Sequence, residues 1–378
     1  MSATIHIEPV TDKKGVLEYV KFPFQLYRGD PNWVPPLIEE RRDFFDPKKN
    51  PFFEHSRCQL FLARRDGELV GTIGAVVNDN HNATHNERSG AFGFLETIND
   101  QAVADALLDA AEEWVRGQGM TIIRGPLNFS LNDEAGTLIE GFDEPPMVMM
   151  TYNPRYYPVL IEAHGYAKAM DLFAWIFNIA EDLQKAPEKL FRVAEKALQR
   201  QGLTVRKVDM KHFDRDLALV KEAYNRAWET NWGFVPMTEH EIDHLAAGLK
   251  PMIDPNLIFI AETADGQPAC VSLTLPDLHQ ALKRSGGGHI FPFGLLKFLW
   301  HRRKIDQCRN MIMGMIGDYR GRGADAIFYL ETAKEALRRG YKRLEGGWVL
   351  ETNTMMNQIV ERLGGRHYKT YRIYERAL

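Results

Sequence analysis

A short, basic, glycine-containing turn is the part of the chain best suited to bind an anion. It comprises Arg320, Gly321, Arg322, Gly323 and Ala324. Glycine permits a backbone that aims successive N–H groups at one point, and the start of a helix adds the positive end of its dipole. A helix is predicted directly after the turn from an apolar stripe at helical spacing, formed by Ala326, Leu330, Ala333 and Leu337. The turn is therefore predicted to hold a diphosphate, although a tight strand-to-helix turn with solvated arginines would have the same composition.

The flanking residues separate this turn from two common phosphate-binding motifs. A P-loop needs Lys followed by Ser or Thr after its glycines, and a dinucleotide fold needs three spaced glycines after the first strand of a βαβ unit. The stretch GDYRGRGADAIFYL has neither pattern.

The turn resembles instead the pyrophosphate-binding motif of the Gcn5-related N-acetyltransferase (GNAT) superfamily. That motif has Arg or Gln, two free positions, Gly, one free position, and Gly or Ala, and it holds coenzyme A. Arg320 and Gly323 fit the pattern, whereas Asp325 departs from it and brings a carboxylate close to the expected phosphates. After the predicted helix comes a strand over residues 343–350 and then Asn353, which opens another helix. The resemblance places Asn353 near the pantetheine arm, and an ordinary helix N-cap explains it equally well.

The N-terminal half carries a fainter copy of this plan, which predicts two domains. A hairpin is expected around Asp66-Gly67, then a strand over 92–98 and a helix whose face is Leu107, Leu108, Ala111 and Val115. Gln101, Ala104 and Ala106 stand at the motif spacing, with Ala in the glycine position. The extra methyl group favours the C-terminal half as the coenzyme A site. We expect an α+β fold of tandem GNAT-like domains, each a mixed, mostly antiparallel sheet flanked by helices, over residues 1–182 and 183–378, with a connecting helix at 187–201.

Most of the chain also resembles the bacterial ceramide synthase-like branch of this superfamily. The resemblance rests on FPFQLYRGDPNWVPPL, NPFFEH, GFLETI, RGPLNFSLNDEAG, YNPRYY, NWGFVPMT and the RGRG turn. It implies transfer of a fatty acyl group from acyl-CoA to the amine of a sphingoid base or similar lipid amine. Acyl carrier protein is an alternative donor.

Amide formation from a thioester requires removal of a proton from the amine and stabilisation of the carbonyl oxygen as it gains charge. Backbone N–H groups of the strand 311–317 are expected to serve the oxygen, and the candidate bases are Glu345, Glu351 and Asp318. Each of these is also explained as an ordinary surface carboxylate. The superfamily's frequent general-acid Tyr is missing, because Val360 occupies its position.

A polar insertion in the N-terminal half is the candidate acceptor site. It contains Asn128, Ser130, Asn132, Asp133 and Glu134, which could bind an amine and a diol-like headgroup. Turn formation by Asn, Asp and Ser explains the same residues without a ligand. No metal site is expected, because His81 and His85 lack a third partner at metal-ligand spacing.

Residues 278–309 combine basic and apolar side chains. Seven cations, against the single acid Asp306, are interleaved with aromatic and aliphatic residues: Lys283, Arg284, Lys297, Arg302, Arg303, Lys304 and Arg309. Such a segment can lie in the headgroup layer of an anionic membrane, and a helix packed on the sheet with a solvated basic edge is the alternative. The triple glycine at 286–288 predicts a flexible start to this segment, so a lid over an apolar substrate is a third interpretation.

Composition places limits on the function. A net charge of −4 does not indicate the basic surface that binding to nucleic acid requires. The three cysteines are scattered along the sequence, which indicates a reducing compartment. The N-terminal residues show no signal peptide and no segment reaches the length of a membrane span, so we expect a cytoplasmic protein, peripheral at the inner face of the cell membrane if the basic segment binds lipid. Two rivals to the N-acyltransferase remain: a catalytically inactive GNAT-like module that binds acyl thioesters or proteins, and a Fem-type aminoacyl transferase, which would need a continuous basic face.

Overall fold

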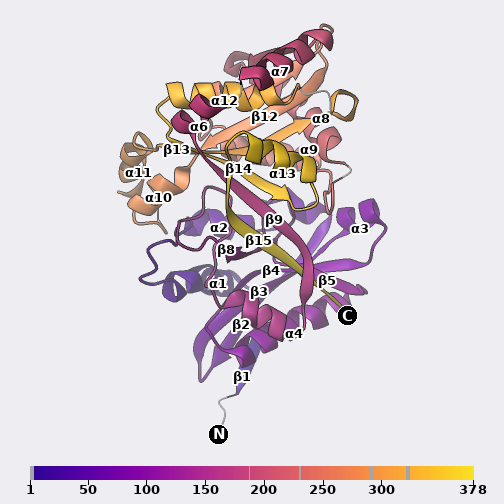
Figure 1. The fold of residues 1–378 in the computed structure, drawn as a ribbon. Coiled ribbons are helices and arrows are strands. Elements are labelled where there is room, and N and C mark those ends of the chain that lie inside the picture. The colour runs from indigo at the N-terminus through magenta and orange to yellow at the C-terminus, as the bar shows by residue number, and fades with distance from the viewer. Residues whose placement is uncertain (1–3, 187, 230, 290–292, 321–323) are drawn as a thin grey trace. The chain divides into compact units, whose positions relative to one another are not determined.

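The structure is a computed structural model that describes residues 4–186, 188–229, 231–289, 293–320 and 324–378 (Figure 1). Gly321, Arg322 and Gly323 of the predicted diphosphate turn lie outside the described residues. The chain divides into two compact units. Unit 1 comprises Met1–Leu172, Leu282–His301 and Lys369–Leu378, and unit 2 comprises Phe173–Ala281 and Arg302–Tyr368.

The units do not simply follow the order of the chain. The last ten residues and a segment from the second half belong to unit 1, and the expected domain boundary after residue 182 lies inside α6 (Ile179–Lys185). Two long strands, β9 (Ala167–Asn178) and β15 (Arg366–Ala377), contribute residues to both units. Where one GNAT-like domain ends and the next begins therefore stays a prediction.

Unit 1 contains a sheet in the order β1-β2-β3-β4-β5-β15. Its first strands are β1 (Ile5–Pro9), β2 (Ser56–Arg65), β3 (Glu68–Asn78), β4 (Ser89–Thr97) and β5 (Ile122–Gly125). Neighbours are antiparallel except for the parallel pair β4–β5. The predicted hairpin is β2–β3, and Asp66 and Gly67 at its turn both have positive φ angles, as a tight hairpin turn requires.

The helices and short strands of unit 1 surround this sheet. They are α1 (Lys13–Leu26), α2 (Ile38–Phe44), α3 (Asp79–His85), α4 (Gln101–Gly117), α5 (Tyr157–Ala163), β6 (Leu127–Asn128), β7 (Glu134–Ala135) and β8 (Thr137–Glu140). The predicted stripe of α4 is fully buried at Leu107, Leu108, Ala111 and Val115. Gly71 of β3 and Gly90 of β4 leave room for Leu107 and Val115, so α4 packs closely on the sheet.

Unit 2 has the strand order β9-β14-β13-β12-β11-β10. Its remaining strands are β10 (Thr204–Lys207), β11 (Ile258–Glu262), β12 (Pro268–Pro276), β13 (Gln307–Met315) and β14 (Arg343–Leu350). Its helices besides α6 are α7 (Glu188–Arg200), α8 (Phe213–Trp228), α9 (Glu239–Leu249), α12 (Ala326–Arg338) and α13 (Thr354–Arg362). Helix α10 (Leu278–Arg284) has residues in both units, and α11 (Gly294–Arg302) belongs to unit 1 except for its last residue. Helix α7 covers most of the predicted connecting segment 187–201, and Gly202 with φ 64° follows it. Its role as a link between two domains stays a prediction.

The core of unit 2 repeats the packing of unit 1. Phe328 and Leu330 of α12 pack against Ala269 and Cys270 of β12, and β13–β14 is the parallel pair that corresponds to β4–β5 (Figure 1). The structure thus has the expected α+β architecture of mixed sheets flanked by helices. No helix among the described residues is long and apolar enough to cross a membrane.

Candidate active site

In each unit the hydrogen bonding between the two parallel strands stops before the strands end. We call the point where they separate the notch of that unit. In unit 2 the pairing of β13 with β14 runs from Gln307–Arg343 to Asn310–Gly346, and β13 then continues to Met315. A β-bulge follows at once, because Leu273 and Thr274 of β12 pair with Ile312 and Asn310 and leave Met311 as an extra residue. A bulge changes the direction of nearby N–H groups, as an oxyanion site in the predicted strand would require.

A buried ion pair lies beside this notch in unit 2. Glu345 of β14 is fully buried, and its Oε1 is 2.9 Å from Nε of Arg309, which stands opposite it on β13 and is equally inaccessible. Arg309 also donates from Nη2 to the Gly347 carbonyl at 2.9 Å, and the Tyr368 hydroxyl donates to Oε2 of Glu345. Glu345 is therefore held by a cation and a phenol.

The other two candidate bases lie nearer solvent. Asp318 follows β13 in a 3-10 turn with 84% of its side chain exposed, 4.0 Å from Arg226. Glu351 follows β14 and is half-buried. The structure thus places three carboxylates in three different environments around the ends of the parallel strands.

The start of α12 is the predicted anion site. Ala324 is fully buried, and Asp325 occupies the N-cap position. Its side chain does not make with any described residue the capping hydrogen bond that Asp100 makes in α4, although the Ala326 N–H lies close enough to act on its carboxyl. Burial raises the pKa of the Asp325 carboxyl. The guanidinium of Arg320 donates from Nε to the Met315 carbonyl at 2.8 Å and from Nη2 to the Ala227 carbonyl, so it ties β13 to the end of α8.

Asn353 has a clear structural role. Its side chain accepts from the Met356 N–H at 3.2 Å and caps α13. The helix-cap alternative is confirmed, and the proposed contact with pantetheine stays a prediction.

The corresponding notch of unit 1 is filled by the chain itself. Pairing of β4 with β5 ends at Ala91–Arg124, and the bulge of β4 lies at Phe94 and Leu95. The N–H of Phe94 donates to Oδ1 of Asn128 at 2.7 Å. A Cβ atom on Gly93 would lie only 2.0 Å from the Leu127 carbonyl oxygen, so β6 packs directly on the bulge.

The start of α4 in unit 1 is also occupied. The Asp100 side chain accepts from the N–H groups of Ala102 and Val103 at 2.9 and 3.4 Å. Arg65 pairs with the same carboxylate at 2.8 Å. The helix end that would face a diphosphate is therefore capped by the protein's own anion.

The polar insertion of unit 1 forms a compact network. Asn128 holds the bulge, Ser130 donates to Asp133 at 3.0 Å, and the Asn132 N–H donates to the Ser130 hydroxyl at 3.1 Å. Glu134 pairs with Arg41 of α2 at 2.6 Å. The five predicted acceptor residues are thus brought together, and each has a structural bond.

Sequence reasoning missed an acidic side chain close to this insertion. Glu96 of β4 accepts hydrogen bonds from the hydroxyls of Tyr27 and Tyr157 at 2.8 and 2.7 Å. Burial raises its pKa to about 7, against the lowering effect of the two tyrosines and Arg41. A carboxylate in the otherwise apolar strand AFGFLET was the available signal, because an acid in a central strand must have polar partners.

Comparison with known proteins decides the family. The chain is 39% identical to a protein named Bacterial ceramide synthase from Caulobacter vibrioides, over all of this chain and 98% of the relative. This chain belongs to the bacterial ceramide synthase-like family of the GNAT superfamily. It is also 36% identical to Protein YghO of Escherichia coli, over 97% of this chain and 94% of the relative.

Family models and solved structures agree with this assignment. The model described as the acetyltransferase (GNAT) family matches residues 24–127, in unit 1. A tandem GNAT protein from the clavulanic acid biosynthesis pathway superposes with a TM-score of 0.54 at 12% identity, covering 99% of this chain and 98% of that one. A GCN5-related N-acetyltransferase from Sphaerobacter thermophilus has a TM-score of 0.53 at 14% identity, covering 99% and 95%. The ceramide synthase-like chain therefore has the tandem GNAT fold, and it is an N-acyltransferase.

Proposed function

We propose that this enzyme transfers a long-chain acyl group from acyl-CoA to the amine of a sphingoid base or a similar lipid amine. The observation that carries the proposal is the full-length similarity to the relative named Bacterial ceramide synthase. The GNAT fold supports the thioester donor, because this superfamily binds acyl-CoA in general.

We place the donor in unit 2. Two features of unit 1 oppose a donor there. The N–H of Phe94 in the bulge already donates to Asn128, and Asp100 caps the start of α4. In unit 2 the Asp325 side chain does not cap α12 among the described residues, and the adjacent glycine turn has the sequence expected of a diphosphate site. The acetyltransferase family model matches residues 24–127 of unit 1, so the support for a donor in unit 2 comes from the residues described above and not from that match.

The base must accept a proton from the attacking amine. Glu345 lies beside the notch of unit 2, in the paired part of the strands, and has no exposed surface, so a proton would reach it through a neighbouring group. Tyr368 is half-buried and already donates to Glu345, and its phenol can pass a proton inward. Asp318 and Glu351, which reach solvent, are the alternatives. Arg309 holds Glu345 in its orientation through the ion pair.

The acceptor headgroup is assigned to unit 1. Asp133, Glu134 and Glu96 supply anionic groups for an ammonium, and the amide side chain of Asn132 and the hydroxyl of Ser130 suit a diol. Because Glu134 is paired with Arg41, an ammonium would have to share that carboxylate.

Helix α11 supports a contact with lipid. Four large apolar side chains are exposed over eight residues: Phe293 by 69%, Leu296 by 67%, Leu299 by 46% and Trp300 by 55%. Exposed Lys297, Arg303 and Lys304 accompany them. Rings and aliphatic groups can enter the headgroup layer while each cation contributes about 1 kcal/mol with anionic lipid. The enzyme would then be cytoplasmic and peripheral at the inner face of the cell membrane.

The start of this segment is less free than its glycines suggested. Gly288 is anchored on both sides, because its carbonyl accepts from the Ile38 N–H at 2.8 Å and its N–H donates to the Pro36 carbonyl at 3.1 Å. A Cβ on Gly287 would lie 2.0 Å from Pro35, so the glycines permit close packing. The backbone at Gly287 and Gly288 is therefore held in place, which opposes a hinge at the glycines themselves.

Turnover with defined substrates tests the proposal. Purified enzyme is incubated with palmitoyl-CoA and a panel of amines that includes sphinganine, and products are read by mass spectrometry. N-acylated sphinganine is expected. Product only with non-lipid amines, or no product with any amine, would contradict the proposed substrate class, and the second result would favour a binding module.

Vesicle sedimentation tests the lipid contact separately. Replacing Arg302, Arg303 and Lys304 by Glu should release the protein from phosphatidylglycerol-containing vesicles while turnover of detergent-dispersed substrate is retained. Unchanged sedimentation would return α11 to an ordinary surface helix.

A further inference from the structure

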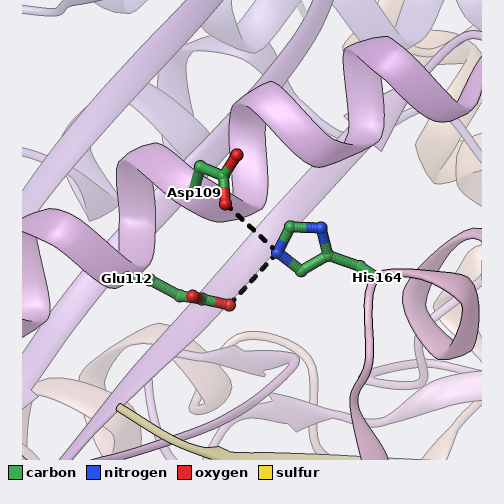
Figure 2. Close-up of side chains that lie close together, drawn as sticks. All are labelled: Asp109, Glu112 and His164. Atoms are coloured by element: carbon green, nitrogen blue, oxygen red, sulfur yellow. Dashed lines mark ion pairs between the residues drawn. The ribbon is translucent and has the colours of Figure 1, made fainter.

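A second polar cluster lies on α4, away from both notches. Asp105, Asp109 and Glu112 are spaced four and three residues apart and therefore share one face of the helix. His164, in the turn after α5, faces Asp109 and Glu112 (Figure 2). The guanidinium of Arg376, from the end of β15, donates to Glu112, and the phenol of Tyr166 lies near the same carboxylate.

The two ring nitrogens of His164 have different surroundings. Nδ1 lies 2.8 Å from Oδ1 of Asp105, which fixes the orientation of the ring. Nε2 is buried, makes no hydrogen bond with any described residue, and points between Asp109 and Glu112 (Figure 2). Only 7% of the His164 side chain is exposed.

The spacing of the facing atoms suits a small metal ion. Nε2 is 3.5 Å from Oδ1 of Asp109 and 3.3 Å from Oε1 of Glu112. Ligand atoms at ~2.0–2.1 Å from a tetrahedral Zn²⁺ are separated by about 3.3–3.4 Å. The same three atoms lie within 4.8 Å of one another. Asp105 then has the place of the carboxylate that commonly accepts a hydrogen bond from a metal-bound histidine.

The charges around this cluster and its exposure to solvent also suit a bound cation. Arg376 donates to Glu112 at 3.0 Å and to the His164 carbonyl at 2.9 Å. Three carboxylates against this one guanidinium leave an excess of negative charge around the His164 ring, which favours a bound cation. The side chain of Asp109 is 70% exposed, whereas that of Glu112 is 6% exposed. An ion can therefore enter from the Asp109 side.

We propose that Asp109, Glu112 and His164 form a Zn²⁺ site, oriented by Asp105, that ties α4 to the turn after α5. Its role is structural, since the ligands lie outside the notch at β4 and β5. Spacing in the sequence alone indicated no metal, because 52 residues separate Glu112 from His164 and the ligands meet only in the fold. The proposal does not depend on the acyl-transfer function.

Calorimetric titration tests it. Chelator-treated full-length protein is titrated with ZnCl₂ and compared with Asp109→Asn, which alters an exposed ligand and should fold normally, and with Glu113→Gln, an exposed neighbour outside the cluster. One ion per chain is expected in the wild type and in Glu113→Gln, with affinity at least about tenfold weaker in Asp109→Asn.

Thermal unfolding provides a second readout. Added Zn²⁺ should raise the Tm of the wild type and of Glu113→Gln more than that of Asp109→Asn. Absence of binding, or binding that Asp109→Asn leaves unchanged, would overturn the proposal and assign any uptake to cysteines or other histidines.

Discussion

In unit 1 the N–H of Phe94 is donated to Asn128 and Asp100 caps α4, whereas in unit 2 Asp325 stands at the start of α12 without capping it among the described residues. The two units share a parallel strand pair, a bulge and a following helix. Unit 1 satisfies the polar groups at that place with its own side chains. A duplicated fold can thus keep one half for structure and acceptor binding and the other for the donor.

Each unit also has an acidic side chain within its sheet, buried Glu345 in unit 2 and half-buried Glu96 in unit 1. Of the two, only Glu345 forms a close ion pair with a buried arginine among the described residues. Removing the charge of Glu345 should have the largest effect of the changes considered. Glu345 is paired with Arg309, so Glu345→Gln leaves a buried cation without its counter-charge. We expect a loss of about 3–5 kcal/mol in the free energy of unfolding, measured in urea, with loss of turnover.

A matched double variant separates stability from chemistry. Replacing Arg309 and Glu345 together by Met should recover most of the stability, because no charge is left buried, yet turnover should stay absent. Full turnover in the double variant would remove Glu345 from the proposed mechanism.

Glu96 in unit 1 provides the contrasting case. Its pKa in the folded protein is about 7, above the value of about 4.3 in an unfolded chain. The protonated carboxyl therefore stabilises the fold at low pH, and this contribution is lost as the pH rises from about 4.3 through 7, by at most about 4 kcal/mol. Glu96→Gln should flatten the dependence of the unfolding free energy on pH between 5 and 8. The same slope in both proteins would show that Glu96 titrates normally.

The difference in N-capping between α4 and α12 predicts a smaller effect on stability. Asp100→Ala removes an N-cap and should cost about 1 kcal/mol of unfolding free energy while leaving the affinity for acyl-CoA unchanged. A weakened acyl-CoA affinity in this variant would place a donor in unit 1 and contradict the comparison.

The corresponding change in unit 2 should have the opposite signature. Asp325→Asn removes a carboxylate near the proposed diphosphate, and we expect a several-fold tighter Kd for acyl-CoA with less than about 1 kcal/mol change in stability. Calorimetry and urea unfolding measure the two quantities. Weaker binding would mean that the Asp325 carboxylate contributes to the site.

The local elements of this fold were predictable, because their signals lie within a few residues. The stripe of α4, the turns at Gly67 and Gly266, and the left-handed Gly202 after α7 all follow from side-chain period and backbone freedom. The α+β class followed from their order.

Long-range pairing was not predictable from the same signals. Nothing local indicates that β15, at the end of the chain, pairs with β5 of unit 1. Likewise, the ion pair of Glu345 with Arg309 depends on the register of β13 and β14. The hydrogen bond between Asn128 and Phe94 joins residues that are 34 positions apart in the sequence. The sequence could therefore name candidate residues but could not separate those with structural bonds from those available to a substrate.

The most direct test of the account is calorimetric titration of palmitoyl-CoA into Gly323→Val, with Ala106→Val, at the last position of the unit 1 motif, as the control. A side chain at Gly323 should keep the backbone from a diphosphate, so we predict loss of binding in Gly323→Val, an unchanged circular dichroism spectrum, and wild-type affinity in Ala106→Val. Wild-type affinity in Gly323→Val, or loss of binding in Ala106→Val alone, would contradict a donor site in unit 2.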